Sequence, residues 1–521
     1  MKLQALDFIV LAVYAIGIIG VALWVSRPTK GHERNTQDYF LAGKSLPWWA
    51  IGASLIAANI SAEQIIGMSG SGYVMGLAIA SYEWMAAITL LIVGKYFLPI
   101  FLDRGIYTMP QFLESRYDHR VRMLLAIFWL GVYIFVNLTS ILWLGALAIN
   151  TVAGVSPFNG MLILGGIAVA YSLYGGLKAV ALTDIIQVIM LVAGGLIIAY
   201  LCMDRISNGN GFLEGLQIVS RELPEKFDMI LSRDNPSYQA MPGISVILGG
   251  MWVMNLSYWG FNQYIIQRAL AAKSPQEAQK GIVMAAYLKL VTPVLVVLPG
   301  IAAVMLVPDL SSPDSAYPQM MTLLPAGLLG LVFAALVAAI VSSVGSMMNS
   351  ISTIFTLDIY ANLRPEKAED QQHLVSIGRA TSFTALLIAL ICAKPLLGNF
   401  DQAFQYIQEF TGFFTPGIVV IFVLGMFWKR ATANSALVAA AGSAALSLLL
   451  KLIWPQVPFM DRVGIVFVIC IALAVIVSLL EDKNQSGAIK LEGVDFSTTS
   501  GFNYASLGLA LILTALYVTW W

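Results

Sequence analysis

Apolar residues in this chain gather into runs of about twenty, and short polar segments separate one run from the next. A helix of that length spans the ~30 Å hydrocarbon layer of a membrane at a rise of ~1.5 Å per residue. The pattern therefore predicts an all-α polytopic membrane protein surrounded by a lipid bilayer. We expect about fourteen spans, at residues 6–26, 48–72, 77–101, 121–153, 158–177, 181–203, 241–268, 281–308, 325–360, 374–393, 401–428, 431–453, 460–480 and 502–520.

The second to sixth spans form one block of five helices, and the seventh to eleventh form another. Because five is odd, two consecutive blocks lie upside down relative to each other, as in inverted-repeat transporters of the LeuT type. Each block opens with a run that glycine and polar residues interrupt, at 59–72 and at 249–263. Such paired interruptions indicate a binding site near the middle of the membrane. The expected domains are 1–47 (a peripheral helix and a cytoplasmic loop), 48–203 (the first repeat), 204–240 (an extracellular loop), 241–428 (the second repeat) and 429–521 (three peripheral helices).

Composition and charge add an orientation to this map. Of the residues 59% are hydrophobic and 11% are charged, whereas a soluble domain carries roughly a quarter charged residues. When charges in the end turns of a span are counted with the adjoining loop, 20 of the 29 lysines and arginines share the side of the loop after the first span. Eight fall on the opposite side, and Lys289 alone lies deep within a span. The positive-inside rule makes the first side cytoplasmic and puts both termini outside.

Six polar side chains fall at membrane depth, where a charged or amide group costs several kcal/mol unless it is paired or faces a wet cavity. They are Asn59, Gln64, Glu83, Asn255, Lys289 and Gln408. Most are neutral amides, which suit the hydroxyls of a sugar because each hydroxyl donates and accepts. Serines and glycines in the same stretches fit close helix packing equally well. Glu63 lies about 100° around a helix from Gln64, and the sequence assigns it no partner.

Aromatic residues stand close to these polar positions in the sequence, notably Tyr82, Tyr258 and Phe404. An aromatic ring can support the apolar C–H face of a pyranose while amides bind its edge. Each aromatic residue alone is also compatible with ordinary packing in a membrane core. Only the combination with the amides favours a sugar.

A cation site is indicated by Ala339, Ser342 and Ser343 in the ninth span. Sodium prefers oxygen ligands, which serine hydroxyls and the carbonyls of an unwound helix supply, here from around Ala57 and Ile60. Two adjacent serines are also common in packed helices. A carboxylate in the sixth span, Asp184, either tunes the cation affinity or lies at the membrane interface.

Other classes of protein leave no complete signature. Gly43, Lys44 and Ser45 resemble the end of a phosphate-binding loop, but Asp38 stands where that motif needs its first glycine. No histidine falls within a predicted span, and no catalytic constellation or nucleic-acid partner is indicated, so we expect a protein that is not an enzyme. A membrane sensor would append a soluble signalling domain, whereas 481–501 is only a short polar loop. A channel would need no paired gates. The sequence does not indicate an oligomeric state.

The chain resembles the solute:sodium symporter family, and within it the bacterial sodium/galactose symporters. The resemblance covers almost the whole sequence. The stretches that carry it are DYFLAGKSLPWW from Asp38, SLIAANISAEQ from Ser54, GKYFLPIF from Gly94, YWGFNQYIIQR from Tyr258, AAIVSS from Ala338, QAFQYIQE from Gln402 and GMFWKR from Gly425.

This resemblance implies sodium-coupled import of a monosaccharide, galactose or glucose, across the plasma membrane, here a bacterial inner membrane, by alternating access. The alternative is a symporter of the same fold for an inositol, sialic acid or an amino acid. The implied sugar contacts are Asn59, Gln64, Glu83, Asn255, Tyr258, Lys289 and Gln408. Tyr258 is implied as the inner gate, and Met68, Tyr82 and Phe404 as the outer gate. The implied sodium ligands are the carbonyls of Ala57, Ile60 and Ala339 and the hydroxyls of Ser342 and Ser343, with Asp184 linked to them.

Two departures from the galactose symporters bear on the preferred sugar. Ala86 stands where those proteins have a serine that helps to hold the sugar, and Ser257 replaces a second aromatic residue next to Tyr258. Neither change removes a group that the transport mechanism requires.

Overall fold

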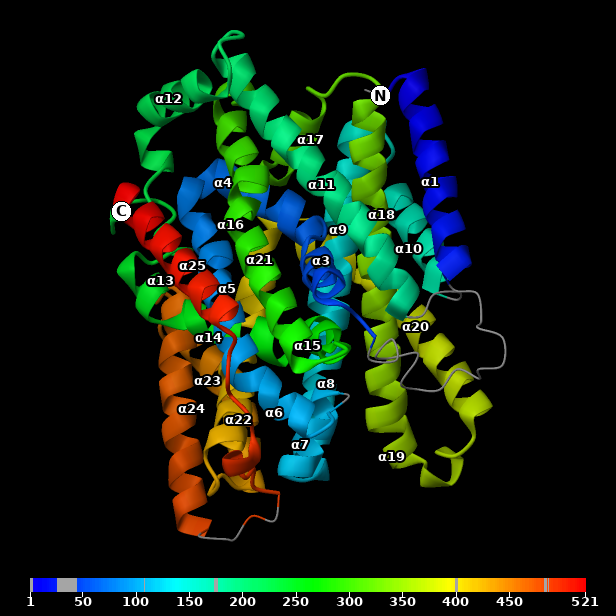
Figure 1. Ribbon diagram of the computed structural model, residues 1–521, viewed down its shortest axis with the longest axis vertical. Coiled ribbons are helices and arrows are strands. Elements are labelled where there is room, and N and C mark those ends of the chain that lie inside the picture. The colour runs from blue at the N-terminus through cyan, green and yellow to red at the C-terminus, as the bar shows by residue number, and fades with distance from the viewer. Residues whose placement is uncertain are drawn as a thin grey trace.

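The computed structural model describes residues 3–25, 45–106, 108–172, 177–398, 402–481, 485 and 487–521. The loop predicted after the first span lies mostly outside these residues. The chain forms a tall bundle of helices (Figure 1), with α12 at one end and α7 and α19 at the other. The N-terminus lies at the end that carries α12.

Every predicted span coincides with one or more helices. The α-helices of the described residues are α1 (Ala5–Val25), α3 (Trp48–Asn59), α4 (Met68–Met75), α5 (Ser81–Ile92), α6 (Leu98–Asp103), α7 (Met109–Arg116), α8 (His119–Val132), α9 (Thr139–Ala153), α10 (Pro157–Ser172), α11 (Leu177–Ile206), α12 (Phe212–Glu222), α13 (Ile244–Leu248), α14 (Gly250–Leu256), α15 (Gln263–Leu270), α16 (Pro275–Leu306), α17 (Ala316–Met321), α18 (Leu328–Thr353), α19 (Ala361–Leu363), α20 (Gln371–Leu397), α21 (Ala403–Thr411), α22 (Thr415–Phe427), α23 (Ala433–Ile453), α24 (Phe459–Glu481) and α25 (Ser500–Thr519). Among them α7, α12, α17 and α19 lie outside the predicted spans. By length and composition, nine helices within the described residues can cross a membrane, or ten with one bent pair. The number fourteen stays a prediction.

The first interrupted helix breaks directly after Asn59. Ile60 leaves the helical conformation with ψ at 80°, and the chain resumes as a wide π-type turn, η2 (Glu63–Gly67), that leads into α4. The amide of Ser61 donates to the carbonyl of Asn59 at 2.8 Å. The usual helical bond to the carbonyl four residues earlier, on Ala57, is thereby replaced. The predicted interruption is confirmed, in a narrower segment than 59–72.

The second interrupted helix breaks at Asn262, after the π-type turn η7 (Ser257–Phe261). Asn262 is extended, with φ at −77° and ψ at 116°, and its side chain accepts from the amide of Tyr264 to start α15. This is N-capping, in which a short polar side chain satisfies an amide that the first helical turn leaves unbonded. Both repeats therefore begin with a broken helix, as the sequence indicates.

The long helix α16 packs against α3, α4, α5 and α11 at the centre of the bundle. The turn between α4 and α5 is made at Gly76, whose φ of 70° favours glycine. A further bend of 47° separates α21 from α22. These breaks place the ends of four short helical segments around one region of the bundle interior.

Each chain end is hydrogen-bonded to a longer loop or to the helix start that follows one, and both contacts lie on the same side of the bundle. Asp7 accepts from the amides of Gly327 and Gly330 at the start of α18, and the carbonyl of Trp520 accepts from the amide of Met229. We refer to this side as the terminal face. The contacts agree with a topology in which both termini share one side of the membrane.

Candidate functional site

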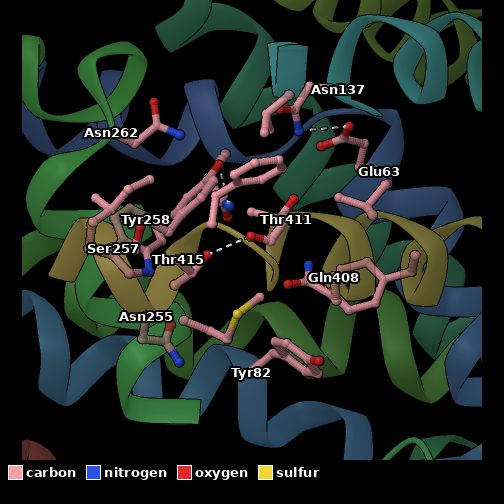
Figure 2. Close-up of a pocket in the computed structure, with 18 of the residues that line it drawn as sticks. Glu63, Tyr82, Asn137, Asn255, Ser257, Tyr258, Asn262, Gln408, Thr411 and Thr415 are labelled. Carbon is pink, nitrogen blue, oxygen red and sulfur yellow. Dashed lines mark hydrogen bonds between the residues drawn. The ribbon is translucent and has the colours of Figure 1, made fainter. Parts of the chain in front are cut away.

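A cavity of about 110 Å³ lies between the broken helices and α21. A cavity needs roughly 10–15 Å³ of such volume to hold one water molecule, so this cavity has room for a ligand the size of several waters. Figure 2 shows Tyr82 and Asn255 toward one end of the cavity and Asn137 and Asn262 toward the other. Eight of the predicted site residues line it, namely Asn59, Gln64, Tyr82, Glu83, Asn255, Tyr258, Phe404 and Gln408.

Lys289 lies behind the cavity wall, where it organises the polar groups. Its ammonium donates to Glu83 Oε2 at 2.6 Å and also to the side-chain oxygen of Asn59. It also lies 4.9 Å from the centre of the Trp259 ring, within the range of a cation–π contact. The resemblance implies Lys289 as a sugar contact, but it does not itself line the cavity, and its described contacts are with Glu83, Asn59 and Trp259.

Glu83 connects this charge to the cavity surface. Its second oxygen accepts from Gln64 Nε2 at 2.5 Å, and the same nitrogen lies 3.2 Å from the sulfur of Met68. A carboxylate with an ammonium and an amide on its two oxygens keeps its buried charge satisfied. Gln64 also lines the cavity.

The end of the cavity nearer the terminal face is closed by aromatic rings. Tyr82 and Phe404 meet edge to face with their ring centres 5.2 Å apart. Met68 is completely buried and does not line the cavity, but it contacts Gln64. Within the described residues the hydroxyl of Tyr82 is buried without a hydrogen-bond partner.

Tyr258 belongs to the second broken helix and lines the cavity. Its hydroxyl accepts from Asn59 Nδ2 at 3.2 Å, so a residue of one broken helix is tied to a residue of the other. The ring of Trp259 packs against it with centres 5.1 Å apart. This hydrogen bond joins the two broken helices directly across the cavity.

The sequence did not indicate the hydrogen bonds beyond Tyr258, nor the part that Tyr133 and Asn137 play in them. Glu63 receives a hydrogen bond from Asn137 Nδ2 at 3.5 Å, and Tyr133 donates to Asn262 Oδ1 at 2.8 Å. Asn137 is an amide in the middle of an apolar run, the same signal that selected Asn59 and Gln64. These groups give the cavity a polar wall toward the face opposite the termini.

The five predicted sodium ligands are all buried. Ala57 and Ile60 lie at the end of α3, where the helical bonding is interrupted, and Ala339, Ser342 and Ser343 lie in the middle of α18. Hydroxyl and carbonyl oxygens are the donor set that a hard monovalent cation prefers. Asp184 belongs to α11, and its side chain lies outside the part of the structure that is described.

Comparison with known sequences gives long matches. The profile of the family described as "Sodium:solute symporter family" matches residues 39–442. A sodium/glucose cotransporter of Vibrio parahaemolyticus is 50% identical, covering 100% of this chain and 99% of that protein. A sodium/glucose cotransporter 4 of Danio rerio is 33% identical over 83% of this chain and 70% of its own length. A sodium/myo-inositol cotransporter 2 of Bos taurus is 34% identical, with coverages of 83% and 68%.

Solved structures confirm the expected architecture. A Na+-coupled sialic acid symporter in a substrate-bound outward-open state has a TM-score of 0.77 at 23% identity, covering 92% of this chain and 98% of that one. Mhp1, a nucleobase-cation-symport-1 transporter in a closed conformation, has a TM-score of 0.55 at 14% identity, with coverages of 91% and 99%. At these identities the likeness shows the fold alone, which is the LeuT-like inverted repeat.

Proposed function

This chain belongs to the sodium:solute symporter family, and from that premise we propose that its cavity binds a monosaccharide, glucose or galactose, which enters the cell together with sodium. The protein is a multi-pass membrane transporter and not an enzyme. The observation that carries the proposal is the cavity itself, which is lined by the amides of Asn59, Gln64, Asn255 and Gln408 and by the carboxylate of Glu83.

The chemistry of these groups matches a neutral polyol. Amides and a carboxylate offer both donors and acceptors to hydroxyls, and the rings of Tyr82, Tyr258 and Phe404 offer apolar faces to the ring carbons. An amino acid would need a fixed cation for its carboxylate. The cation here, Lys289, is already engaged by Glu83. The glucose cotransporters among the relatives support this choice, and the myo-inositol cotransporters make inositol the second candidate.

Sodium binds, in our proposal, between the end of α3 and the middle of α18. The carbonyls of Ala57, Ile60 and Ala339 and the hydroxyls of Ser342 and Ser343 are its ligands, and Asp184 adjusts its affinity. Because two of these carbonyls belong to the broken helix that also carries Asn59, sodium orders the same segment that receives the sugar.

Transport proceeds by alternating access. Sodium favours the form open at the terminal face, sugar enters past Met68, Tyr82 and Phe404, and the two repeats rock until Tyr258 moves away from Asn59. One sodium ion moving down ~100 mV supplies ~2.3 kcal/mol, and a roughly tenfold gradient adds ~1.4. Together they concentrate the sugar by roughly several hundredfold.

The map of the chain is part of the proposal. The first repeat comprises 48–203 and the second 241–428, with 204–240 as an extracellular loop and 1–47 and 429–521 as peripheral parts. Both termini face outward from a bacterial inner membrane. The excess of lysine and arginine on the opposite side supports this orientation.

The test is uptake by purified protein in liposomes. Labelled glucose, galactose and myo-inositol are each offered with an inward gradient of sodium, potassium or protons. We expect accumulation of glucose or galactose with sodium alone. Equal uptake driven by protons contradicts the sodium assignment, and preferential accumulation of inositol replaces the proposed substrate.

A further inference from the structure

The helix α21 carries two groups that face the cavity from one side, the amide of Gln408 and the ring of Phe404. They lie four residues apart, which places them one above the other on the same face of a helix. The orientation of α21 therefore sets the position of a proposed sugar contact and of a proposed gate together.

The next residue, Glu409, points to a different part of the protein. Its Oε1 accepts from Arg462 at 2.9 Å and from Lys451 at 2.8 Å. Arg462 lies at the start of α24 and Lys451 near the end of α23, so one carboxylate oxygen joins three helices. The side chain of Arg462 is 6% exposed and that of Lys451 is 39% exposed, which makes the arginine contact the better shielded one.

Aromatic rings of the same segment extend this contact. The guanidinium of Arg462 lies 5.7 Å from the centre of the Phe413 ring, and the ammonium of Lys451 lies 5.3 Å from that of Phe410. Both cations thus contact the end of α21 through charge and through ring faces, over which cations are attracted. We call Glu409, Lys451 and Arg462 the α21 anchor.

The α21 anchor affects the orientation of α21 because this helix is short. It has nine residues and is bent by 47° from α22, and helices shorter than about 12 residues have little stability of their own. Its direction depends on what holds it from outside. Both cations lie beyond residue 442, where the match to the family profile ends, so these two charges come from the peripheral part of the chain. At its other end α21 is held from within the bundle, where Asp314 accepts from the amide of Ala403 at 2.9 Å.

We propose that the α21 anchor positions Gln408 and Phe404 for sugar binding, and that Arg462 and Glu409 are positioning residues of the transport site. The proposal rests on the proposed function, since it assigns the peripheral helices α23 and α24 a role at that site. Neither residue touches the sugar. Their removal tilts α21 and changes sugar binding, while sodium binding at α18 is unaffected.

The experiment measures the half-saturation constants of uptake for sugar and for sodium in the full chain in liposomes. The solute is the one that the wild type accumulates in the uptake assay above. Arg462→Gln is expected to raise the sugar constant roughly tenfold, as expected for one misplaced hydrogen bond, and to leave the sodium constant within about twofold. Lys451→Gln has a smaller effect in the same direction because its charge is partly solvated.

The matched control is Lys429→Gln, which removes a 2.9 Å ion pair to Glu492 in the same peripheral region, where both side chains are exposed. It leaves both constants unchanged. An Arg462→Gln variant with an unchanged sugar constant overturns the proposal, and so does one that weakens sugar and sodium to the same degree, because that result indicates general damage. A wild type that accumulates no sugar or polyol contradicts the proposed function as a whole.

A partly buried glutamate without its arginine can still prevent folding, so two further variants are included. Arg462→Lys retains the charge without the forked geometry, and its sugar constant is expected between those of the wild type and Arg462→Gln. Glu409→Gln with Arg462→Gln removes both charges together, which avoids an unpaired buried charge. If the double variant folds and binds sugar like the wild type, the proposal is wrong.

Discussion

The ammonium of Lys289 lies 2.6 Å from Glu83 Oε2, and the two side chains are 0% and 4% exposed. Removing one member leaves an uncompensated charge in the bundle interior, whereas removing both leaves none. Because Glu83 also holds Gln64, and Lys289 also holds Asn59, the pair fixes the two amides in place.

We therefore expect Lys289→Met and Glu83→Gln each to destabilise the protein by about 3–5 kcal/mol, the usual cost of breaking a buried pair. The double variant is expected to recover part of the loss. The measurement is the thermal unfolding temperature of the purified protein in detergent. Lys280→Met on the same helix is the control, since Lys280 is exposed and 3.7 Å from Glu277. A double variant less stable than either single one contradicts the pairing.

Sugar affinity is the second test of the cavity. Gln64→Ala and Gln408→Ala each remove an amide from the cavity lining, and each is expected to weaken sugar binding by roughly 5- to 30-fold. The double variant is expected to bind no sugar at attainable concentrations, as measured by isothermal calorimetry in the presence of sodium. Gln217→Ala on the exposed face of α12 is the control. Sugar binding that survives the double substitution excludes this cavity as the site.

The sequence predicted the fold well because its signals are local. A run of twenty apolar residues needs no knowledge of its neighbours, and glycine and asparagine interrupt helices for reasons of the backbone itself. The positions of the two breaks followed from this, although the first is narrower than 59–72. The number of spans that the apolar pattern gives, fourteen, stays a prediction.

The candidate site residues could be predicted where one polar side chain alone is unfavourable at membrane depth. Asn59, Gln64, Glu83 and Gln408 are polar groups at membrane depth, which is reason enough to expect a wet cavity. Partnerships between distant segments were not predictable. Glu409 and Arg462 stand 53 residues apart, and only the tertiary fold brings them together.

The sodium assignment depends on hydroxyls that the apolar pattern alone did not distinguish from packing residues. We expect Ser343→Ala to remove the dependence of sugar uptake on sodium, because the cation loses one of few oxygen ligands in a buried position. The measurement is uptake over a range of sodium concentrations. Ser350→Ala on the same helix is the control, since that hydroxyl donates to the carbonyl of Ser346 within the helix. Unchanged coupling in Ser343→Ala contradicts the site.

The loop 204–240 holds the end of α4 at the terminal face. Lys226 donates from its ammonium to the carbonyls of Val74 at 2.6 Å and Tyr73 at 3.2 Å. The backbone of Lys226 lies so close to Gly76 that a Cβ there would come within 2.2 Å of its carbonyl oxygen. Burial lowers the pKa of the Lys226 amine. Since α4 carries Met68, which we propose as part of the outer gate, we expect this contact to stabilise the form in which that gate is closed.

Lys226→Gln is accordingly expected to shift the population toward the form open at the terminal face. A hydrogen bond from a charged donor contributes about 1.5–3 kcal/mol when it is shielded from water. Because Lys226 is partly exposed, we expect a contribution of roughly 1 kcal/mol, which corresponds to about a fivefold change in the population ratio of the two forms. The measurement is the rate of alkylation of a cysteine introduced at Gln405, in a variant without the native cysteines. The control is Arg221→Gln, an exposed residue of the same loop that pairs with its neighbour Glu222. An alkylation rate in Lys226→Gln equal to that of the control shows that the loop does not restrain the gate.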